Sequence, residues 1–145
     1  MQRTAQAVWN GTGLEGSGTL TTLSGAMKEQ PYSFKLRFQD EHGTDGTNPE
    51  ELIAAAHAGC FSMALSFGLT NAGHPPTQLQ TKAVLTMEKQ PIGFTIVGIV
   101  LKVTGTVAGI TAERFVELAE AAKAGCPISR ALNVPISLEA SLTSA

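Results

Sequence analysis

Two cysteines are the residues best suited to covalent chemistry, and their contexts differ. Cys60 lies in the middle of a long, uncharged segment of small and apolar residues, LIAAAHAGCFSMALSFGL, from Leu52 to Leu69. Cys126 lies in the sequence Ala-Gly-Cys-Pro, at a predicted helix start. A cysteine is nucleophilic as its thiolate, so a reactive cysteine needs surroundings that lower its pKa. The question for each is therefore what stabilises its negative charge.

Cys60 gains little from its own helix. It lies eleven residues after Pro49, the expected first helical residue, which is about 16 Å along the axis at ~1.5 Å per residue. The helix dipole acts only within the first turn, and burial raises the pKa of a thiol. If Cys60 is catalytic, another element must therefore supply a cation. The alternative is that Cys60 is a packing residue.

Arg37 is the first candidate for that cation. Among the four arginines, it alone lies on an expected amphipathic strand just upstream of the helix. That strand, residues 32–38, places its apolar residues on one face and Ser33, Lys35 and Arg37 on the other. A neighbouring carboxylate would hold the guanidinium by a bidentate pair, and Glu50 and Glu51 are the candidates. The alternative is that Glu50 and Glu51 only stabilise the helix start through its dipole and improve solubility.

Cys126 is expected at or next to a helix N-terminus, where backbone N–H groups favour an anion. Such a cysteine is accessible and suited to exchange with another sulfur. The alternative is that the location of Cys126 at a helix start has no chemical role. A metal site made of His57, Cys60 and Cys126 is conceivable, but the spacing matches no zinc pattern.

The three histidines have no assigned chemistry. His57 lies one turn before Cys60 on the same helical face. Its simplest role is that of a core histidine that hydrogen-bonds a backbone carbonyl. His42 and His74 fall in expected loops and have no identifiable partner.

The elements that must position these residues begin with strands and a long helix. Strands are expected over residues 4–10, 17–23 and 32–38, with glycine-rich turns between them. The central helix is expected from about Pro49 to about Asn71. Asn48 is a good N-cap, proline suits the first helical position, and Gly73 lies near the C-cap. The helix is apolar on nearly every side, so it is expected to be buried on nearly every side.

The C-terminal half is expected to contain a hairpin, a second helix and a last strand. Residues 77–89 and 94–107 should pair across a turn at residues 91–93. Thr111 caps a helix that Gly125 ends, with an apolar stripe at Phe115, Leu118, Ala119 and Ala122. A short helix from Cys126 to about Leu132 and a strand over residues 134–142 follow. The predicted order is β-β-β-α-β-β-α-β, an α+β fold in one domain of residues 1–145.

Composition excludes some functions. Charged residues make up 15% of the 145 residues and the net charge is −2, with no basic patch, so nucleic acid is an unexpected partner. The central helix is long enough to span a membrane, but it contains His57 and many small residues and lacks flanking anchors. No membrane partner is expected. The N-terminus lacks the apolar run of a signal peptide, so a cytoplasmic location is expected. The 43% hydrophobic content indicates that another copy covers part of the surface.

Three segments of the chain resemble the OsmC/Ohr family of osmotically inducible and organic hydroperoxide resistance proteins. They are Asn48-Pro49-Glu50-Glu51-Leu52, the run AAAHAGCFSMAL from Ala54 to Leu65, and AKAGCPIS from Ala122 to Ser129. The similarity covers nearly the whole chain and is closer to the OsmC branch than to the Ohr branch. It implies an OsmC/Ohr-like fold, assembled as an intertwined homodimer.

The resemblance also implies a thiol-dependent peroxidase without a metal or flavin cofactor. Cys60 would match the peroxidatic cysteine and Cys126 the resolving cysteine, forming a Cys60–Cys126 disulfide. Glu50 matches the family glutamate and Arg37 its arginine. The implied small molecules are an organic hydroperoxide and a dithiol reductant of the dihydrolipoamide type. A non-catalytic redox sensor or hydrophobic-ligand-binding protein, which uses the same thiol pair without turnover, is the alternative.

Overall fold

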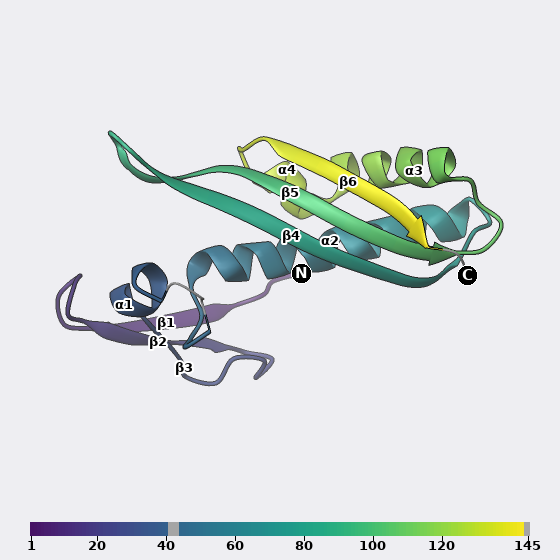
Figure 1. Ribbon diagram of the computed structural model, residues 1–145. Coiled ribbons are helices and arrows are strands. Elements are labelled where there is room, and N and C mark those ends of the chain that lie inside the picture. Colours follow the sequence, from purple (N-terminus) through teal and green to yellow (C-terminus); the bar gives the residue numbers. More distant parts are fainter. Residues whose placement is uncertain (41–43, 144–145) are drawn as a thin grey trace. The chain divides into compact units, whose positions relative to one another are not determined.

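The computed structural model describes residues 1–40 and 44–143, in two compact units (Figure 1). The first comprises residues 1–52 and the second residues 53–145, and each is described by itself. The expectation of a single domain over residues 1–145 stays a prediction. His42, which the sequence places in a loop, lies outside the described residues.

The first unit contains a three-stranded antiparallel sheet in the order β1-β2-β3. The strands are β1 (Ala5–Asn10), β2 (Ser17–Thr22) and β3 (Gln30–Ser33). Close packing requires a glycine at position 18 of β2, because a Cβ there would lie 2.1 Å from the Val8 carbonyl oxygen and 2.6 Å from the Tyr32 ring. The sheet therefore brings the Trp9 and Tyr32 rings together, with centroids 5.3 Å apart.

The predicted strand over residues 32–38 is wrong beyond Ser33. The chain turns there into a five-residue helix, α1 (Phe34–Phe38). Ser33 is its N-cap and accepts a hydrogen bond from the Leu36 N–H at 3.1 Å. Phe34 and Phe38 are four residues apart, and their rings pack with centroids 4.8 Å apart and planes tilted by 45°. The alternating residues 34–38 therefore form a helix, and Arg37 lies in its last turn, where the dipole favours a cation.

The long helix α2 (Pro49–Asn71) has the predicted bounds. The Asn48 side chain accepts from the Glu51 N–H at 2.8 Å, which confirms the N-cap. At the other end Gly73 has a φ of 85° and donates to Thr70, while the His74 N–H donates to the Leu69 carbonyl at 2.9 Å. This pair of bonds is a Schellman motif, which needs the left-handed conformation that glycine adopts easily.

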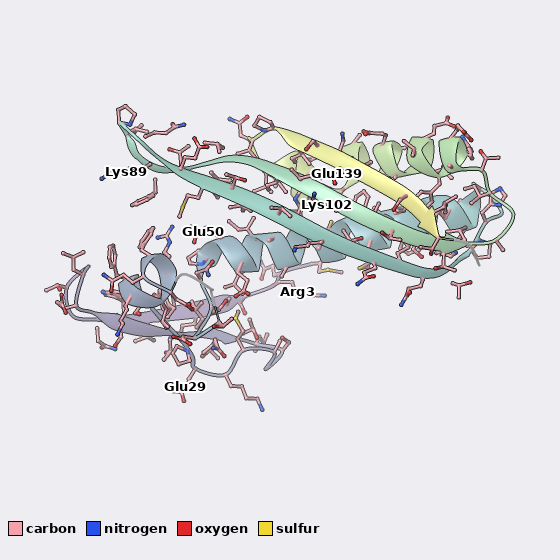
Figure 2. The ribbon with its side chains drawn as sticks, in the orientation of Figure 1. Arg3, Glu29, Glu50, Lys89, Lys102 and Glu139 are labelled. Atoms are coloured by element: carbon pink, nitrogen blue, oxygen red, sulfur yellow. The ribbon has the colours of Figure 1, made fainter. Side chains whose placement is uncertain are left out.

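The second unit contains a three-stranded sheet with β5 in the centre, in the order β4-β5-β6. The predicted hairpin is confirmed: β4 (Pro76–Gln90) and β5 (Gly93–Val107) pair antiparallel, with Gln90 opposite Gly93. The last strand, β6 (Ile136–Thr143), pairs parallel to β5. On the outer face the Lys102 ammonium lies 2.9 Å from its cross-strand neighbour Glu139 (Figure 2).

Helices α3 (Ala112–Gly125) and α4 (Pro127–Ala131) connect β5 to β6. Thr111 caps α3, and the predicted stripe faces the core, with Leu118 only partly buried. The Phe115 ring packs so closely on β5 that a Cβ at Gly105 would lie 2.6 Å from it. The short helix predicted from Cys126 to about Leu132 is confirmed as α4, although the predicted eight-element order did not count it. With α1, which was not predicted, the order becomes β-β-β-α-α-β-β-α-α-β.

Helix α2 is buried along one stripe, so the expectation of burial on nearly every side is wrong for this chain. The buried residues are four apart, at His57, Phe61, Leu65 and Leu69, and the last three join the core with β5 and α3. On the opposite side Met63 is 64% exposed and Phe67 67% exposed. α2 also has the length and hydropathy of a membrane span, a property that core helices share.

Candidate functional site

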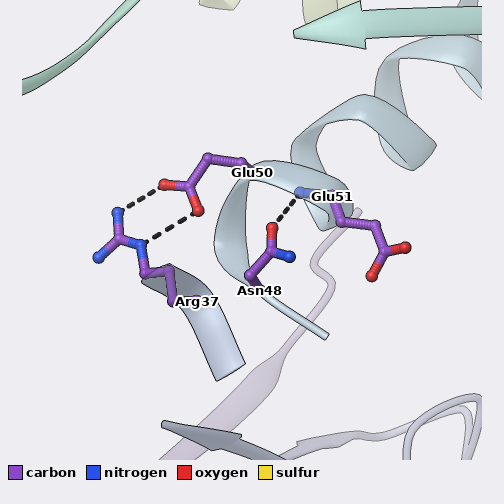
Figure 3. A network of polar contacts seen from close by, with 4 residues as sticks. All are labelled: Arg37, Asn48, Glu50 and Glu51. Carbon is purple, nitrogen blue, oxygen red and sulfur yellow. Dashed lines mark hydrogen bonds and ion pairs between the residues drawn. The ribbon is translucent and has the colours of Figure 1, made fainter. Parts of the chain in front are cut away.

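The first polar group of interest is an ion pair in the first unit. Glu50, in the first turn of α2, receives two hydrogen bonds from Arg37 of α1 (Figure 3). The Arg37 Nε donates to Oε2 at 3.1 Å, and Nη2 donates to Oε1 at 2.5 Å. This is the bidentate geometry that guanidinium and carboxylate groups favour. The predicted pairing of Arg37 with a neighbouring carboxylate is thus confirmed, and Glu50 is the partner.

Glu51 has a different partner, although it adjoins Glu50 in the sequence. Its carboxylate accepts a hydrogen bond from the Thr47 hydroxyl at 2.8 Å, and its N–H is capped by Asn48. Successive residues of a helix point about 100° apart, so the two acidic side chains diverge at the helix start. Glu51 therefore anchors the loop that precedes α2, and Glu50 holds the arginine.

Arg37 also borders a small aromatic pocket within the first unit. The pocket has a volume of about 120 Å³, and its aromatic lining comes from Trp9, Tyr32, Phe34 and Phe38. The Arg37 guanidinium carbon lies 4.8 Å from the centre of the Phe38 ring, within cation–π range. An organic group and a polar head that accepts hydrogen bonds could therefore be bound side by side here.

The second polar group is the thiol pair, in the second unit. The Cys60 sulfur, on α2, lies 2.8 Å from the Cys126 sulfur, which directly precedes α4. The thiols are free, and a disulfide bond is about 2.05 Å long, so a shift of under ~1 Å would join them. Cys126 is fully buried, which corrects the expectation that it is accessible, whereas Cys60 is partly exposed.

The two thiols have opposite pKa shifts. Burial raises the pKa of Cys60, and its hydrogen bond with Cys126 raises it further. Burial alone would also raise the pKa of Cys126, but hydrogen bonds from Cys60, Ser129 and Ile128 outweigh it and lower that pKa. Within this unit, Cys126 is therefore the more acidic thiol. A reactive Cys60 would still need the outside cation that its sequence position implies.

His57 belongs to a hydrogen-bonded group that sequence reasoning missed. Its Nε2 lies 2.8 Å from the hydroxyl oxygen of Ser129, on α4. The expected bond from His57 to a backbone carbonyl is wrong. The contact of His57 with Ser129 spans 72 residues and had no sequence signal.

The structure thus brings together Arg37 with Glu50 and, separately, Cys60 with Cys126. Metal binding finds no support in the described residues 1–40 and 44–143, where no group of three histidine, cysteine, aspartate or glutamate side chains could hold an ion. The conceivable metal site of His57 and the two cysteines therefore has no counterpart there. His57 contacts Ser129 instead.

The comparisons with known proteins place the chain in a family. The family described as OsmC-like protein matches residues 41–141. The chain belongs to this family. It is 46% identical to peroxiredoxin OsmC of Escherichia coli over 144 residues, which cover 99% of each chain. It is 32% identical to organic hydroperoxide resistance protein OhrA of Bacillus subtilis, with 85% of this chain and 82% of OhrA aligned. These values confirm the closer resemblance to the OsmC branch.

Solved structures of related proteins have the same fold. The organic hydroperoxide resistance protein OhrB of Bacillus subtilis has a TM-score of 0.71 and 26% identity, and the match covers 97% of this chain and 98% of OhrB. An OsmC-like protein from Vibrio cholerae has a TM-score of 0.76 at 15% identity, with 97% of this chain and 99% of that one covered. The OsmC/Ohr-like α+β fold expected from the sequence is therefore confirmed.

Proposed function

We propose that this OsmC-family protein is a cysteine-based peroxidase that reduces organic hydroperoxides. The observation that carries the proposal is the thiol pair, with the Cys60 and Cys126 sulfurs 2.8 Å apart inside one compact unit. The relatives named peroxiredoxin and organic hydroperoxide resistance protein support a peroxide-related function. The thiol mechanism and the substrate class are the proposed refinements.

The proposed cycle balances over three steps. The Cys60 thiolate attacks the distal oxygen of ROOH, the O–O bond breaks, and the departing alkoxide takes a proton, which gives ROH and a Cys60 sulfenic acid. The Cys126 sulfur then displaces the hydroxyl group, which forms the Cys60–Cys126 disulfide and water. A dithiol reductant of the dihydrolipoamide type opens the disulfide by exchange and is itself oxidised to a cyclic disulfide.

Arg37 and Glu50 are assigned to the first step. A guanidinium beside Cys60 would offset the burial that raises the pKa of this thiol, and it would stabilise charge on the departing alkoxide. Glu50 holds the guanidinium by two hydrogen bonds, so the arginine would enter the reaction already oriented. The aromatic pocket beside Arg37 suits the organic group of a hydroperoxide better than it suits hydrogen peroxide.

We propose further that the protein is a homodimer and that its sites are shared between chains. Glu50 and Cys60 are ten residues apart on one helix, about 15 Å along its axis, which exceeds the reach of a side chain. Helices that cross antiparallel near Ala54-Ala55-Ala56 would bring each Glu50 to the partner's Cys60. Support comes from exposed apolar surface on α2 and from the first unit, none of whose described large apolar side chains is buried.

The second candidate function is a redox sensor or a hydrophobic-ligand-binding protein that uses the same thiol pair without turnover. One observation favours it: burial raises the pKa of Cys60, so this unit alone holds little of the thiolate that peroxide reduction needs. A sensor needs to react only once per signal. The two candidates therefore differ in turnover, which can be measured.

The deciding experiment is a steady-state assay with cumene hydroperoxide and three reductants: dihydrolipoamide, thioredoxin with its reductase, and glutathione. The peroxidase proposal predicts many equivalents of hydroperoxide consumed per chain with dihydrolipoamide, and slower consumption with the other two. Consumption that stops after about one equivalent with every reductant would reject the peroxidase in favour of the sensor. The Cys60→Ser variant supplies the uncatalysed rate.

A further inference from the structure

Two side-chain contacts, about one helical turn apart, connect α2 with α4 and the residue that precedes it. The Cys60 sulfur lies 2.8 Å from the Cys126 sulfur, and His57 Nε2 lies 2.8 Å from the Ser129 hydroxyl oxygen. His57 comes three residues before Cys60, and Ser129 comes three residues after Cys126. Residues at this spacing are neighbours on a helix. The second contact therefore lies beside the reacting sulfurs, and the proposed cycle gives it no part.

Cys126 is the point at which α3 ends and α4 begins. Its backbone is extended, with a φ of −60° and a ψ of 124°, and its N–H donates to the Ala122 carbonyl at 2.9 Å. α3 is fixed in the core by Phe115, Ala119 and Ala122. The chain is therefore anchored up to Cys126, and the position of α4 decides the direction in which it continues.

The apolar core does not hold α4 in place. The helix is five residues long, and none of these described residues is buried. Helices this short are not stable by themselves in water, so contacts with the rest of the protein must position them. His57 supplies one such contact from a fully buried position on α2. A buried polar group thus holds a helix that buried apolar side chains do not.

The hydrogen bond between His57 and Ser129 has a definite direction. His57 Nδ1 is buried and has no hydrogen-bond partner among the described residues. A proton on Nδ1 would leave a buried N–H without an acceptor, an arrangement that is rare in proteins. Burial lowers the pKa of His57, which keeps the ring neutral with a single proton. That proton is therefore on Nε2, and the imidazole donates it to the Ser129 oxygen.

We propose that the His57–Ser129 hydrogen bond is a clamp that holds α4 on α2 and so keeps the Cys126 sulfur within reach of the Cys60 sulfur. His57 and Ser129 are positioning residues, because they act through the placement of Cys126. The inference rests on the proposed function, since it concerns how the disulfide of that cycle forms. The deciding tests use glutathione and no hydroperoxide, so they can fail independently of the peroxidase.

The clamp acts at the step that forms the disulfide. The Cys126 sulfur attacks the sulfur of the Cys60 sulfenic acid, the S–O bond breaks, and the hydroxyl group leaves as water with the proton of Cys126. A second hydroperoxide competes for the same sulfenic acid and oxidises it to the sulfinic acid. Two groups that are already held together react faster than groups that must first be ordered. The clamp therefore favours the disulfide over the sulfinic acid.

The first test measures how strongly the fold favours the disulfide. Two molecules of reduced glutathione open the Cys60–Cys126 bond and leave as oxidised glutathione, so the equilibrium constant gives the effective concentration of one thiol at the other. The equilibrium is approached from the reduced protein and from protein oxidised with diamide, and it is read by mass spectrometry after acid quenching. Ser129→Ala should lower the effective concentration by about three- to tenfold, since α4 then leaves α2 in part of the reduced molecules. An unchanged value would overturn the proposal.

Ser62→Ala is the matched control for a weakened hydrogen bond close to Cys60. The Ser62 hydroxyl donates to the Thr81 hydroxyl at 2.7 Å, which connects α2 with β4. Ser62→Ala should therefore leave the effective concentration of the thiols as it is in the unaltered protein. A fall as large as that in Ser129→Ala would mean that any weakened bond near Cys60 has this effect, and it would overturn the clamp.

His57 is tested by two replacements in the same equilibrium. His57→Leu removes the donor and should lower the effective concentration by about the same factor as Ser129→Ala, whereas His57→Gln keeps a side-chain N–H and should restore most of it. Because the two residues form one bond, His57→Leu should add little once Ser129 is alanine. A full further fall in the double variant would overturn the clamp. Ser129 lies on a helix without buried residues, so Ser129→Ala still decides the matter if His57→Leu does not fold.

The last test places the clamp in the proposed cycle. Reduced protein is mixed with an increasing excess of cumene hydroperoxide, and sulfinic acid at Cys60 is quantified by mass spectrometry. Ser129→Ala should reach half-maximal overoxidation at about three- to tenfold less hydroperoxide than the unaltered protein or Ser62→Ala. Equal overoxidation in all three proteins would overturn the role in disulfide formation. An absence of Cys60 oxidation in all three would instead reject the proposed function, with the glutathione equilibrium still deciding on the clamp.

Discussion

The Arg37–Glu50 pair and the Cys60–Cys126 pair are built from the same long helix, but in different ways. The ion pair joins residues 13 apart, lies in the first turn of α2 and is partly exposed. The thiols are 66 residues apart and meet in the core, where Cys126 has no exposed surface. The charged pair is therefore held by local geometry, and the thiol pair depends on the packing of α2 against the sheet and α3.

The difference matters for chemistry because each region lacks what the other has. The first unit offers a fixed cation and an aromatic pocket but has no cysteine in its sequence. The second unit offers two thiols, but burial raises the pKa of the one predicted to attack. Four experiments test this contrast between the two regions.

The largest effect is expected from the cysteines. Cys60→Ser should abolish peroxide reduction, because no other nucleophile is assigned to the first step. Cys126→Ser should still reduce about one equivalent and then stop, leaving Cys60 as a sulfenic acid that overoxidises readily. Mass spectrometry after one equivalent of hydroperoxide checks both results. Sulfenic acid trapped on Cys126, with Cys60 still reduced, would reverse the two assignments.

The cation should have the next largest effect. Arg37→Ala should slow the reaction with hydroperoxide by about 10²- to 10³-fold and move the pH–rate profile to higher pH, since Cys60 then has nothing to offset its burial. Lysine should rescue poorly because it lacks the planar fork. Arg114→Ala is the matched control, as Arg114 pairs with Glu117 on α3. A pH–rate profile that Arg37→Ala leaves unchanged would point to Arg130, beside Cys126.

If each site is shared between two chains, two inactive variants should recover activity when they are combined in one dimer. Glu50→Ala and Cys60→Ser chains, each inactive, are unfolded, mixed and refolded together. In a mixed dimer one site would have both residues intact and the other neither, so about half of its sites should be active. Native mass spectrometry confirms that mixed dimers form. Mixed dimers without activity would mean that Glu50 acts within its own chain.

The sequence predicts those features of the fold that depend on residues close together in the chain. Asn48 and Gly73 marked the ends of α2 because capping is decided within a few residues. The β4–β5 hairpin followed from alternation on both sides of a short turn. The same rules explain the failure at residues 34–38. A stretch of alternating apolar residues also places Phe34 and Phe38 four residues apart, which is the spacing of neighbours on one face of a helix. The N-cap bond to Ser33 then favours a helix over a strand.

The candidate site could be predicted in part. Arg37 and Glu50 were identified from charge and position, and the thiol pair came from family resemblance. The hydrogen bond between His57 and Ser129 could not be predicted, because it forms only when α4 is brought onto α2 by contacts far apart in the sequence. Nor could the single chain's sequence show that α2 would bury one stripe and leave Met63 and Phe67 exposed.

The smallest effect concerns stability and tests the buried side of the comparison. Burial lowers the pKa of His57 in the folded protein, whereas the unfolded chain binds a proton near the ordinary value of 6.5. Below about pH 6.5 the unfolded state therefore holds more protons on this group than the folded state does. The free energy of unfolding should fall as pH decreases through this window, by at most about 1.4 kcal/mol per pH unit from this one group.

The matched variant is His57→Gln, whose side-chain amide can still form a hydrogen bond with Ser129 but does not titrate. Urea unfolding, followed by circular dichroism between pH 7.5 and 5.5 at one protein concentration, isolates the contribution of His57 as the difference between the two proteins. The unaltered protein should lose stability more steeply than His57→Gln as pH falls, so the two should converge. Equal slopes would mean that His57 binds its proton equally well folded and unfolded. The buried region would then tolerate charge as the exposed Arg37–Glu50 region does, and the contrast between the two regions would no longer hold.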